Sequence, residues 1–257
     1  MLISSIVYLL LTAGYKEEAM KSAHTIQNIN PPASWVDLPW GEYYRAALER
    51  QLQPWWPKIF GFHLLKVGNL SAEIDSKECP IFNQINVGKE GKNMQVITDP
   101  YHLPFEEKSV DACLLSHMLA YSADPHRLLR EVDRVMIDDG WLIISGFNSL
   151  SLLGLGKLVP GLWRHQPYCS RMFSLMRQLD WLSLLNYEVM YRDSFQILPW
   201  RNETGFVNRR LSVLGCVSLI IARKRTLPLT LNQMKVTLLK PKLGSAVGVT
   251  KCYRKRS

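Results

Sequence analysis

The sequence lacks paired cysteines, and it lacks any apolar run long enough to cross a membrane. Its five cysteines are scattered along 257 residues without the spacing of a zinc site or a disulfide framework. Two of them, Cys113 and Cys216, lie inside apolar segments, where cysteine usually acts as a small hydrophobic side chain. This usage is typical of a reducing compartment, so we expect a cytoplasmic protein without a metal site.

The apolar segment at the N-terminus, Leu2–Ala13, has the length of a signal peptide but is too short to span a bilayer. No basic residue precedes it, since the first lysine is Lys16, and no convincing small-residue cleavage site follows. Lys16-Glu17-Glu18 can be encoded AAG GAG GAG, which contains a ribosome-binding sequence just before Met20. We therefore expect translation to start at Met20 and residues 1–19 to be an untranslated leader, without stable membrane insertion. A weak signal peptide or membrane anchor is the alternative.

Acidic residues are absent from the C-terminal part of the chain. From Arg223 onward there are ten basic residues and no acidic one: Arg223, Lys224, Arg225, Lys235, Lys240, Lys242, Lys251, Arg254, Lys255 and Arg256. Without these ten, 21 basic residues face 22 acidic ones, so the net charge of +9 belongs to the tail. We expect residues 226–257 to form a basic flexible tail. It either makes weak nucleic-acid contacts through phosphates or is simply solvated, which is the commoner role of such charge runs.

Short apolar segments separated by helical patterns predict an α/β fold. Val110–Leu115 and Trp141–Ser145 have the length and composition of strands buried on both faces of a parallel sheet, and Val96–Thr98 is a shorter segment of the same kind. His63–Val67 and Asn83–Val87 are the expected first and second strands. At this chain length, one α/β domain is the simplest organisation.

Helix signals lie between and after these strands. Asp124-Pro125 predicts a helix start, and Asp138-Asp139-Gly140 predicts its end and a turn. A later helix is expected to begin at Ser170, before an antiparallel strand pair at 187–191 and 214–222. The inward residues expected for the two helices are Leu128, Leu129, Val132, Val135 and Met136, and then Met172, Leu175, Met176, Leu179 and Leu182.

The N-terminal arm, residues 20–60, is polar and proline-bearing before an expected helix at Tyr43–Leu52, which Pro54 ends. Four tryptophans surround this helix: Trp35, Trp40, Trp55 and Trp56. They either form a lid over a pocket or pack the arm onto the sheet, and such tryptophans more often do the second.

Ligands of parallel α/β sheets bind at the carboxyl ends of the strands. That rule singles out Asp99 after one strand, Ser116 and His117 after the next, and Phe147 and Asn148 after the third. We expect the chemistry of the protein at these positions.

Several motifs follow one another in the middle of the chain: Asp99, Leu103-Pro104-Phe105, Ser109-Val110-Asp111, Asp124-Pro125, Glu131 and Arg134-Val135. Their order resembles that of class I S-adenosylmethionine-dependent methyltransferases of the methyltransferase type 11 group. The resemblance implies a Rossmann-like fold, with a seven-stranded sheet that is parallel except for the last strand and helices on both faces. It also implies S-adenosylmethionine as cofactor and a methyltransferase-like domain at residues 61–225.

The resemblance places a glycine-rich loop after the first strand, where the backbone approaches the methionine portion of the cofactor. Gly68 and Asn69 match the start of this loop and are expected to bind the cofactor. Leu70 and Ala72 stand in the places of the second and third glycines. Lys66 stands where the family usually has an acidic residue. Its charge is expected to disfavour the ammonium group of the cofactor, although it could still meet the carboxylate.

Three further positions complete the expected cofactor site. The family usually has an acidic residue at the end of the second strand for the ribose hydroxyls, and this chain offers Asn86, followed by Glu90 a little late. Asp99 matches the carboxylate that receives the adenine amino group, although it could equally cap its own loop. Pro100 and Ser116 join this set.

The acceptor side is expected at His117, Phe147 and Asn148. His117 is a weak candidate for a general base, because histidine titrates near neutral pH, but it has no identifiable carboxylate partner. A pocket wall or a structural histidine is the alternative. The chain lacks an Asn/Asp-Pro-Pro-Phe/Tyr motif, so amino-methylation of bases or glutamine gains no support.

The predicted function is S-adenosylmethionine-dependent methyl transfer to an acceptor that the sequence does not define. Two alternatives come from other classes. Leu70, Ala72 and Lys66 are the evidence for a methyltransferase-like binding or scaffold protein with impaired cofactor binding. The basic tail is the evidence for an RNA-associated factor. The sequence does not define the oligomeric state.

Overall fold

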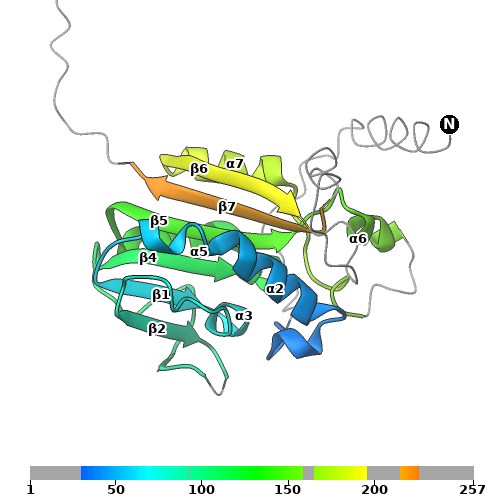
Figure 1. The fold of residues 1–257 in the computed structure, drawn as a ribbon, viewed down its shortest axis with the longest axis horizontal. Helices are drawn as coiled ribbons and strands as arrows, with labels where there is room; N and C mark the ends of the chain where they lie inside the picture. The colour runs from blue at the N-terminus through cyan, green and yellow to red at the C-terminus, as the bar shows by residue number, and fades with distance from the viewer. Residues whose placement is uncertain (1–29, 92, 159–164, 196–214, 226–257) are drawn as a thin grey trace, which may run out of the picture. The chain divides into compact units, whose positions relative to one another are not determined.

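The computed structural model describes residues 30–91, 93–158, 165–195 and 215–225 (Figure 1). Seven strands form one sheet in the order β3-β2-β1-β4-β5-β7-β6. Their bounds are β1 His63–Val67, β2 Asn83–Gly88, β3 Val96–Ile97, β4 Val110–Ser116, β5 Met136–Phe147, β6 Tyr187–Phe195 and β7 Val217–Lys224. Strands β1 to β5 pair in parallel, while β7 runs antiparallel to both of its neighbours. The predicted Rossmann-like sheet, parallel except for the last strand, is therefore confirmed.

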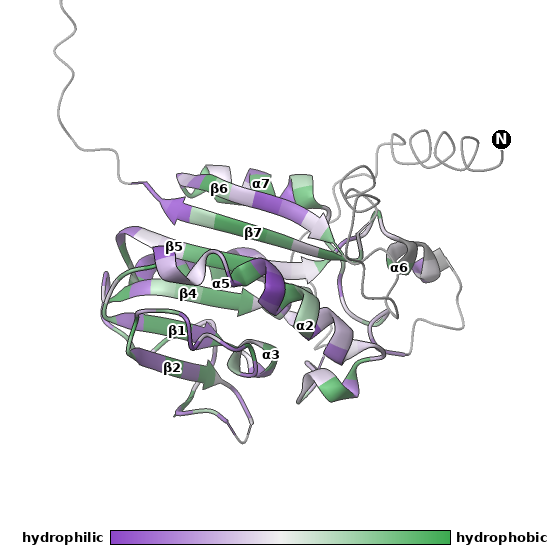
Figure 2. Ribbon diagram, viewed as in Figure 1, coloured by the Kyte–Doolittle hydropathy of each residue, from purple (hydrophilic) through white to green (hydrophobic). Residues whose placement is uncertain are grey.

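Helices cover both faces of this sheet (Figure 1). The helical segments are η1 Trp35–Asp37, α2 Gly41–Leu52, η2 Trp56–Lys58, α3 Asn69–Ala72, α4 Met118–Tyr121, α5 Pro125–Val135, α6 Leu152–Leu155, η3 Gly156–Leu158 and α7 Leu175–Leu184. Neighbouring residues of one strand enter different cores: Leu64 packs with the α2 side and Leu65 with the α5 and α7 side. The central strands are apolar along most of their length (Figure 2), as strands buried on both faces should be.

Helix α5 begins as predicted, but its end differs from the prediction. The Asp124 side chain caps it by accepting a hydrogen bond of 3.0 Å from the Arg127 backbone N–H. The helix ends at Val135, and β5 follows at once, so that Asp138-Asp139-Gly140 lies inside a strand and the predicted turn is wrong. Asp139 adopts a left-handed φ of 64°, and the pairing register of β4 with β5 shifts between Val110 and Ala112. A bulge thus absorbs the turn-forming residues.

The C-terminal elements differ from prediction at their ends and in the orientation of one methionine. Helix α7 is capped by Ser174 rather than Ser170, and Met176 is 70% exposed rather than inward. Strand β6 continues to Phe195, and β7 begins at Val217. The expected antiparallel pairing of the last two strands is confirmed.

The N-terminal arm is packed onto the sheet by two of its tryptophans. Trp35 and Trp56 are buried in the core that includes α2. The Trp35 indole N–H donates a hydrogen bond of 2.9 Å to the Leu70 carbonyl. For these two residues the packing interpretation holds, and neither forms a lid.

A pair of side chains on α5 holds the loop between β3 and β4. Glu131 Oε1 accepts a hydrogen bond of 2.8 Å from the Leu103 backbone N–H. Arg134 donates to the carbonyls of Leu103 and Phe105 and pairs with Glu131 at 2.7 Å. The hydrogen bonds from Arg134 hold the pKa of the Glu131 carboxyl below its usual range. These contacts give Glu131 and Arg134 a physical role in positioning the loop that contains Asp99.

Arg134→Gln should lower the free energy of unfolding by about 1–3 kcal/mol, because two loop carbonyls and one carboxylate lose a charged donor. Arg130→Gln on the same helix is the matched control, since Arg130 is exposed. Urea unfolding of both variants is the measurement. Equal stability of the two variants would show that the pair does not hold the loop.

In the described part of the chain, no helix is long and apolar enough to cross a membrane, and no three metal-ligating side chains are grouped. The predicted leader, residues 1–19, and the basic tail, residues 226–257, lie outside the described residues. The domain bounds at 20–60 and 61–225 stay predictions.

Candidate functional site

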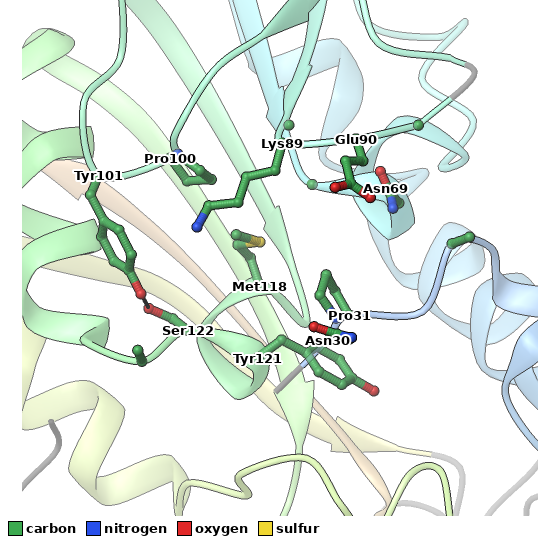
Figure 3. A pocket seen from close by; sticks show the side chains of 15 residues that line it. Asn30, Pro31, Asn69, Lys89, Glu90, Pro100, Tyr101, Met118, Tyr121 and Ser122 are labelled. Atoms are coloured by element: carbon green, nitrogen blue, oxygen red, sulfur yellow. Dashed lines mark hydrogen bonds between the residues drawn. The ribbon is translucent and has the colours of Figure 1, made fainter. Parts of the chain in front are cut away.

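A cavity of about 640 Å³ lies at the carboxyl ends of β1, β2 and β4 (Figure 3). Its walls come from the loops after β1, β2 and β3, from α4 and the residues after it, and from the arm before η1. The lining residues are Asn30, Pro31, Ala33, Gly68, Asn69, Gly88, Lys89, Glu90, Gly91, Pro100, Tyr101, Met118, Tyr121, Ser122 and Ala123. Its volume is that of a site for a small molecule or a nucleoside cofactor.

Gly68 forms the floor of the cavity through its backbone. Its φ of 89° and ψ of 160° lie in a region that is essentially restricted to glycine. A Cβ at this position would lie 2.9 Å from Met118 Sδ. The Gly68 N–H donates a hydrogen bond of 2.7 Å to the Val87 carbonyl, which ties the loop to the end of β2. The first position of the predicted glycine-rich loop therefore has the conformation that requires glycine.

The residues in place of the second and third glycines are part of a short helix, α3. Leu70 is 3% exposed and packs into the core beside Trp35, and it does not line the cavity. Between Leu70 and Ala72, the Ser71 hydroxyl donates to the Val67 carbonyl at 2.6 Å and accepts from the Ser116 N–H at 2.7 Å. Leu70 and Ala72 adopt helical backbone, which does not require glycine. Neither residue lines the cavity, so leucine and alanine in place of the two glycines leave it open.

Lys66 also lies away from the cavity. Its ammonium group donates a hydrogen bond of 2.9 Å to the Ile74 carbonyl, beyond α3. Burial lowers the pKa of this lysine, and the charges of Asp75 and Glu49 partly oppose that shift. Because Lys66 is not among the lining residues, the predicted repulsion of a cofactor ammonium is not supported by this arrangement.

The loop after β2 supplies the charged side chains of the cavity, Lys89 and Glu90 (Figure 3). Lys89 Nζ lies 3.5 Å from Asp99 Oδ1 and 5.7 Å from the centre of the Tyr101 ring. Asn86 is turned toward its own loop, where its amide donates to the Asn93 carbonyl at 2.9 Å. Among the described residues, Glu90 is the one that lines the cavity with a carboxylate.

The wall opposite this loop is held by hydroxyl groups. Tyr101 Oη and Ser122 Oγ are 2.7 Å apart, and the Asp124 N–H donates to Tyr101 Oη at 3.1 Å. The Tyr121 hydroxyl donates to Gln166 Oε1 at 2.9 Å, and burial raises the pKa of Tyr121. Met118 lies between the two sides, beneath the position of Lys89 (Figure 3).

His117 is fully buried directly after β4, with a left-handed φ of 56°. Its ring lies edge-on to Trp35 and Phe147, with ring centres 5.1 Å and 4.3 Å away. Nδ1 is 3.4 Å from the hydroxyl groups of both Ser116 and Ser145. Burial lowers the pKa of His117 to about 3, so the ring is neutral near pH 7. The arrangement is that of a structural histidine.

Of the predicted site residues, the structure brings Gly68, Asn69 and Pro100 together around the cavity. Asp99 precedes the lining residue Pro100 without lining the cavity itself, Ser116 is buried and does not line it, and Asn86 faces Asn93. Phe147 and Asn148 are buried, the second with its amide donating to the Gly215 carbonyl at 3.1 Å. The binding roles of these residues stay predictions.

The sequence did not reveal several parts of the cavity. The arm residues Asn30, Pro31 and Ala33 lie far from the strand ends in the sequence, and no local pattern marks them as lining. Met118 and Tyr121 carried a weak signal, since they directly follow the β4 strand end.

Comparisons with known proteins agree with this architecture. A family model described as a methyltransferase domain matches residues 73–144. The chain is 58% identical over 237 residues to the uncharacterized protein YafS of Escherichia coli (strain K12), covering 92% of this chain and 99% of that protein. Among solved structures, an S-adenosylmethionine-dependent methyltransferase from Thermotoga maritima matches with a TM-score of 0.50 at 18% identity, covering 72% of this chain and 95% of that one. A geranyl diphosphate methyltransferase in complex with sinefungin matches with a TM-score of 0.51 at 16% identity, covering 69% and 77%.

Proposed function

The chain belongs to the class I S-adenosylmethionine-dependent methyltransferase family, and on this basis we propose that it transfers a methyl group from S-adenosylmethionine bound in the cavity at the carboxyl ends of β1, β2 and β4. The observation that carries the proposal is Gly68, whose glycine-only backbone conformation forms the cavity floor at the end of β1. In this family that position lets the backbone approach the cofactor. We place the reaction in the cytosol, in keeping with the scattered cysteines.

The residues around the cavity fit this cofactor. Three glycines line it, and a Cβ at Gly91 would lie 2.7 Å from Asn69 Oδ1, just as one at Gly68 would meet Met118. Backbone therefore forms much of the wall on the side of β1 and β2. Pro100 and Met118 add apolar surface, and Glu90 adds a carboxylate.

For this reaction we assign roles to the residues around the cavity. Glu90 and Asn69 would accept hydrogen bonds from the cofactor's hydroxyl or ammonium groups, since both line the cavity from adjoining loops. Tyr101 and Pro100 would cover its planar base. When bound, S-adenosylmethionine would supply a sulfonium methyl group that an acceptor nucleophile attacks, with S-adenosylhomocysteine leaving as the methyl–sulfur bond breaks. His117 takes no proton in this scheme, because it is fully buried and its pKa near 3 makes it a weak base, so the protein acts chiefly by alignment.

The two alternative functions gain no support from the structure. The scaffold hypothesis rested on Leu70, Ala72 and Lys66, and Leu70 and Lys66 point away from the cavity. The RNA hypothesis rested on residues 226–257, which lie outside the described residues. The methyl acceptor is the open part of the proposal.

Calorimetric titration of S-adenosylmethionine and S-adenosylhomocysteine into the full chain tests the proposal. Glu90→Gln should weaken binding by about tenfold to a hundredfold, because a charge-assisted hydrogen bond is worth about 1.5–3 kcal/mol. Asp99→Asn is the paired variant and should have the smaller effect, since Asp99 is partnered with Lys89 and does not line the cavity.

A larger loss in Asp99→Asn than in Glu90→Gln would instead support the assignment made from sequence resemblance. If a well-folded sample binds neither compound at millimolar concentration, the methyltransferase proposal itself fails.

A further inference from the structure

A lysine shares the cavity with any ligand that enters it. Lys89 belongs to the loop after β2, and its side chain extends across the cavity toward Pro100 and Tyr101 (Figure 3). Its Nζ lies 3.5 Å from Asp99 Oδ1 and 5.7 Å from the centre of the Tyr101 ring. Among the described residues, Lys89 is the one that lines the cavity with a cationic side chain. A bound ligand therefore meets a positively charged hydrogen-bond donor.

The position of Lys89 is not explained by its contribution to stability. The side chains of Lys89 and Asp99 are 59% and 45% exposed, and ion pairs between exposed side chains add little to the stability of a fold. The Tyr101 ring has a second cation beside it, since Arg127 Cζ lies 5.6 Å from its centre. The ammonium group of Lys89 carries three N–H donors, and the pair with Asp99 engages one of them. The group can therefore donate to a ligand without leaving Asp99.

The three residues after Asp99 offer a ligand no backbone donor. Pro100 has no N–H group. The Tyr101 N–H donates to Asp99 Oδ1 at 3.4 Å, and the His102 N–H donates to the Asp99 carbonyl at 2.8 Å. Hydrogen bonds to Asp99 thus occupy the donors that follow it. On this side of the cavity, the ammonium group of Lys89 takes the place of a backbone donor.

The proposed function places a purine base beside Tyr101 and Pro100, and the following inference rests on it. We propose that Lys89 recognises this base by donating a hydrogen bond from Nζ to one of its ring nitrogens. The unprotonated ring nitrogens of adenine accept hydrogen bonds, whereas its amino group donates them. An ammonium group has donors only, so it pairs with a ring nitrogen and not with the amino group. Asp99 is a positioning residue in this arrangement, because it holds Nζ on the side of Tyr101.

A carboxylate is the other partner that an ammonium group takes readily, and the methionine portion of the cofactor carries one. The proposed function places that portion at Gly68, which follows β1. Asp99 and Tyr101 follow β3, which lies two strands from β1 in the sheet order. Neighbouring strands are about 4.8 Å apart, so Asp99 holds the lysine toward the base and away from the methionine portion.

Calorimetric titration of S-adenosylhomocysteine into the full chain and into Lys89→Met is the first test. Methionine retains an unbranched side chain and removes the charge and the donors. We expect Lys89→Met to weaken binding about tenfold, because a hydrogen bond from a charged donor is lost. Lys77→Met is the matched control, since Lys77 pairs with Asp75 at 3.4 Å, is 89% exposed and does not line the cavity. This control should bind like the parent.

Three analogues of S-adenosylhomocysteine identify the accepting atom. In the 1-deaza, 3-deaza and 7-deaza forms, a C–H group replaces one ring nitrogen of adenine. We expect one of the three to bind the parent about tenfold more weakly than S-adenosylhomocysteine does. The same analogue should bind Lys89→Met as S-adenosylhomocysteine does, because the hydrogen bond is already absent and the two losses do not add.

The inference is overturned if all three analogues bind the parent like S-adenosylhomocysteine, a result that needs no variant. It is also overturned if Lys89→Met binds as tightly as the parent or more tightly. Equal weakening of S-adenosylhomocysteine and all three analogues by Lys89→Met would overturn it as well and point to the carboxylate. These outcomes leave methyl transfer standing, whereas a parent that binds no S-adenosylhomocysteine would end the proposed function and this inference together.

Discussion

Gly68→Ala should weaken S-adenosylmethionine binding by about tenfold to a hundredfold and lower the free energy of unfolding by about 1–3 kcal/mol. An alanine must either adopt the strained φ of 89° or move the loop that forms the cavity floor. Its Cβ would also press on Met118 Sδ at 2.9 Å, inside the cavity. Calorimetric titration and urea unfolding measure the two effects separately.

Gly146→Ala is the matched control for this experiment. It lies near the carboxyl end of β5, where a Cβ would find its nearest atoms at 3.8 Å and 4.0 Å, which is ordinary contact. We expect this variant to bind and unfold like the parent. Similar affinities for the Gly68 and Gly146 variants would mean that the loop after β1 does not contact the cofactor.

The burial of His117 should make the protein less stable in acid. The folded state holds the pKa of His117 at about 3, whereas the unfolded chain has an ordinary histidine that titrates near 6.5. Below this value the unfolded state takes up the proton, so stability is lost as the pH falls from about 6.5 toward 3. The residues in contact with the ring, Trp35, Phe147, Ser116 and Ser145, carry no charge that would oppose this.

His117→Asn removes this proton linkage and retains a residue that tolerates the left-handed φ of 56°. The variant should be less stable at neutral pH, because ring contacts are lost. The stability gap to the parent should then narrow by about 2–3 kcal/mol between about pH 7 and pH 4.5. Urea unfolding at several pH values measures it, and other titrating groups cancel in the comparison. A gap that stays constant with pH would show that the pKa of His117 is the same in the folded and unfolded states.

Much of the fold could be predicted from local sequence patterns. The bounds of β1 matched the prediction, and α5 began at its predicted cap, because each is defined by nearby residues such as Asp124. The predicted turn at Asp138-Asp139-Gly140 failed because tertiary pairing overrode composition: Asp139 takes the left-handed conformation inside a bulge, and Arg223 Nε donates to its carbonyl from β7. That partner lies 84 residues away, so no local pattern could reveal it.

The candidate site was predicted less completely. The family resemblance identified Gly68, Asn69 and Pro100, but it could not state which way a side chain points. Lys66 and Leu70 were expected to disturb the cofactor, and both face the core or the residues beyond α3. Their orientation depends on Trp35 and Ile74, which contact them from other segments. The lining contributed by the arm depended on the same long-range packing.

The position of Leu70 bears on how this loop can change over evolutionary time. A change to glycine at Leu70 would leave a cavity in the core beside Trp35, and deletions of buried leucine side chains cost about 2–5 kcal/mol. The helical turn would lose a good helix former in the same step. A single substitution toward the usual glycine-rich loop would therefore destabilise the fold. Glycine at this position would need a compensating change in the core beside Trp35.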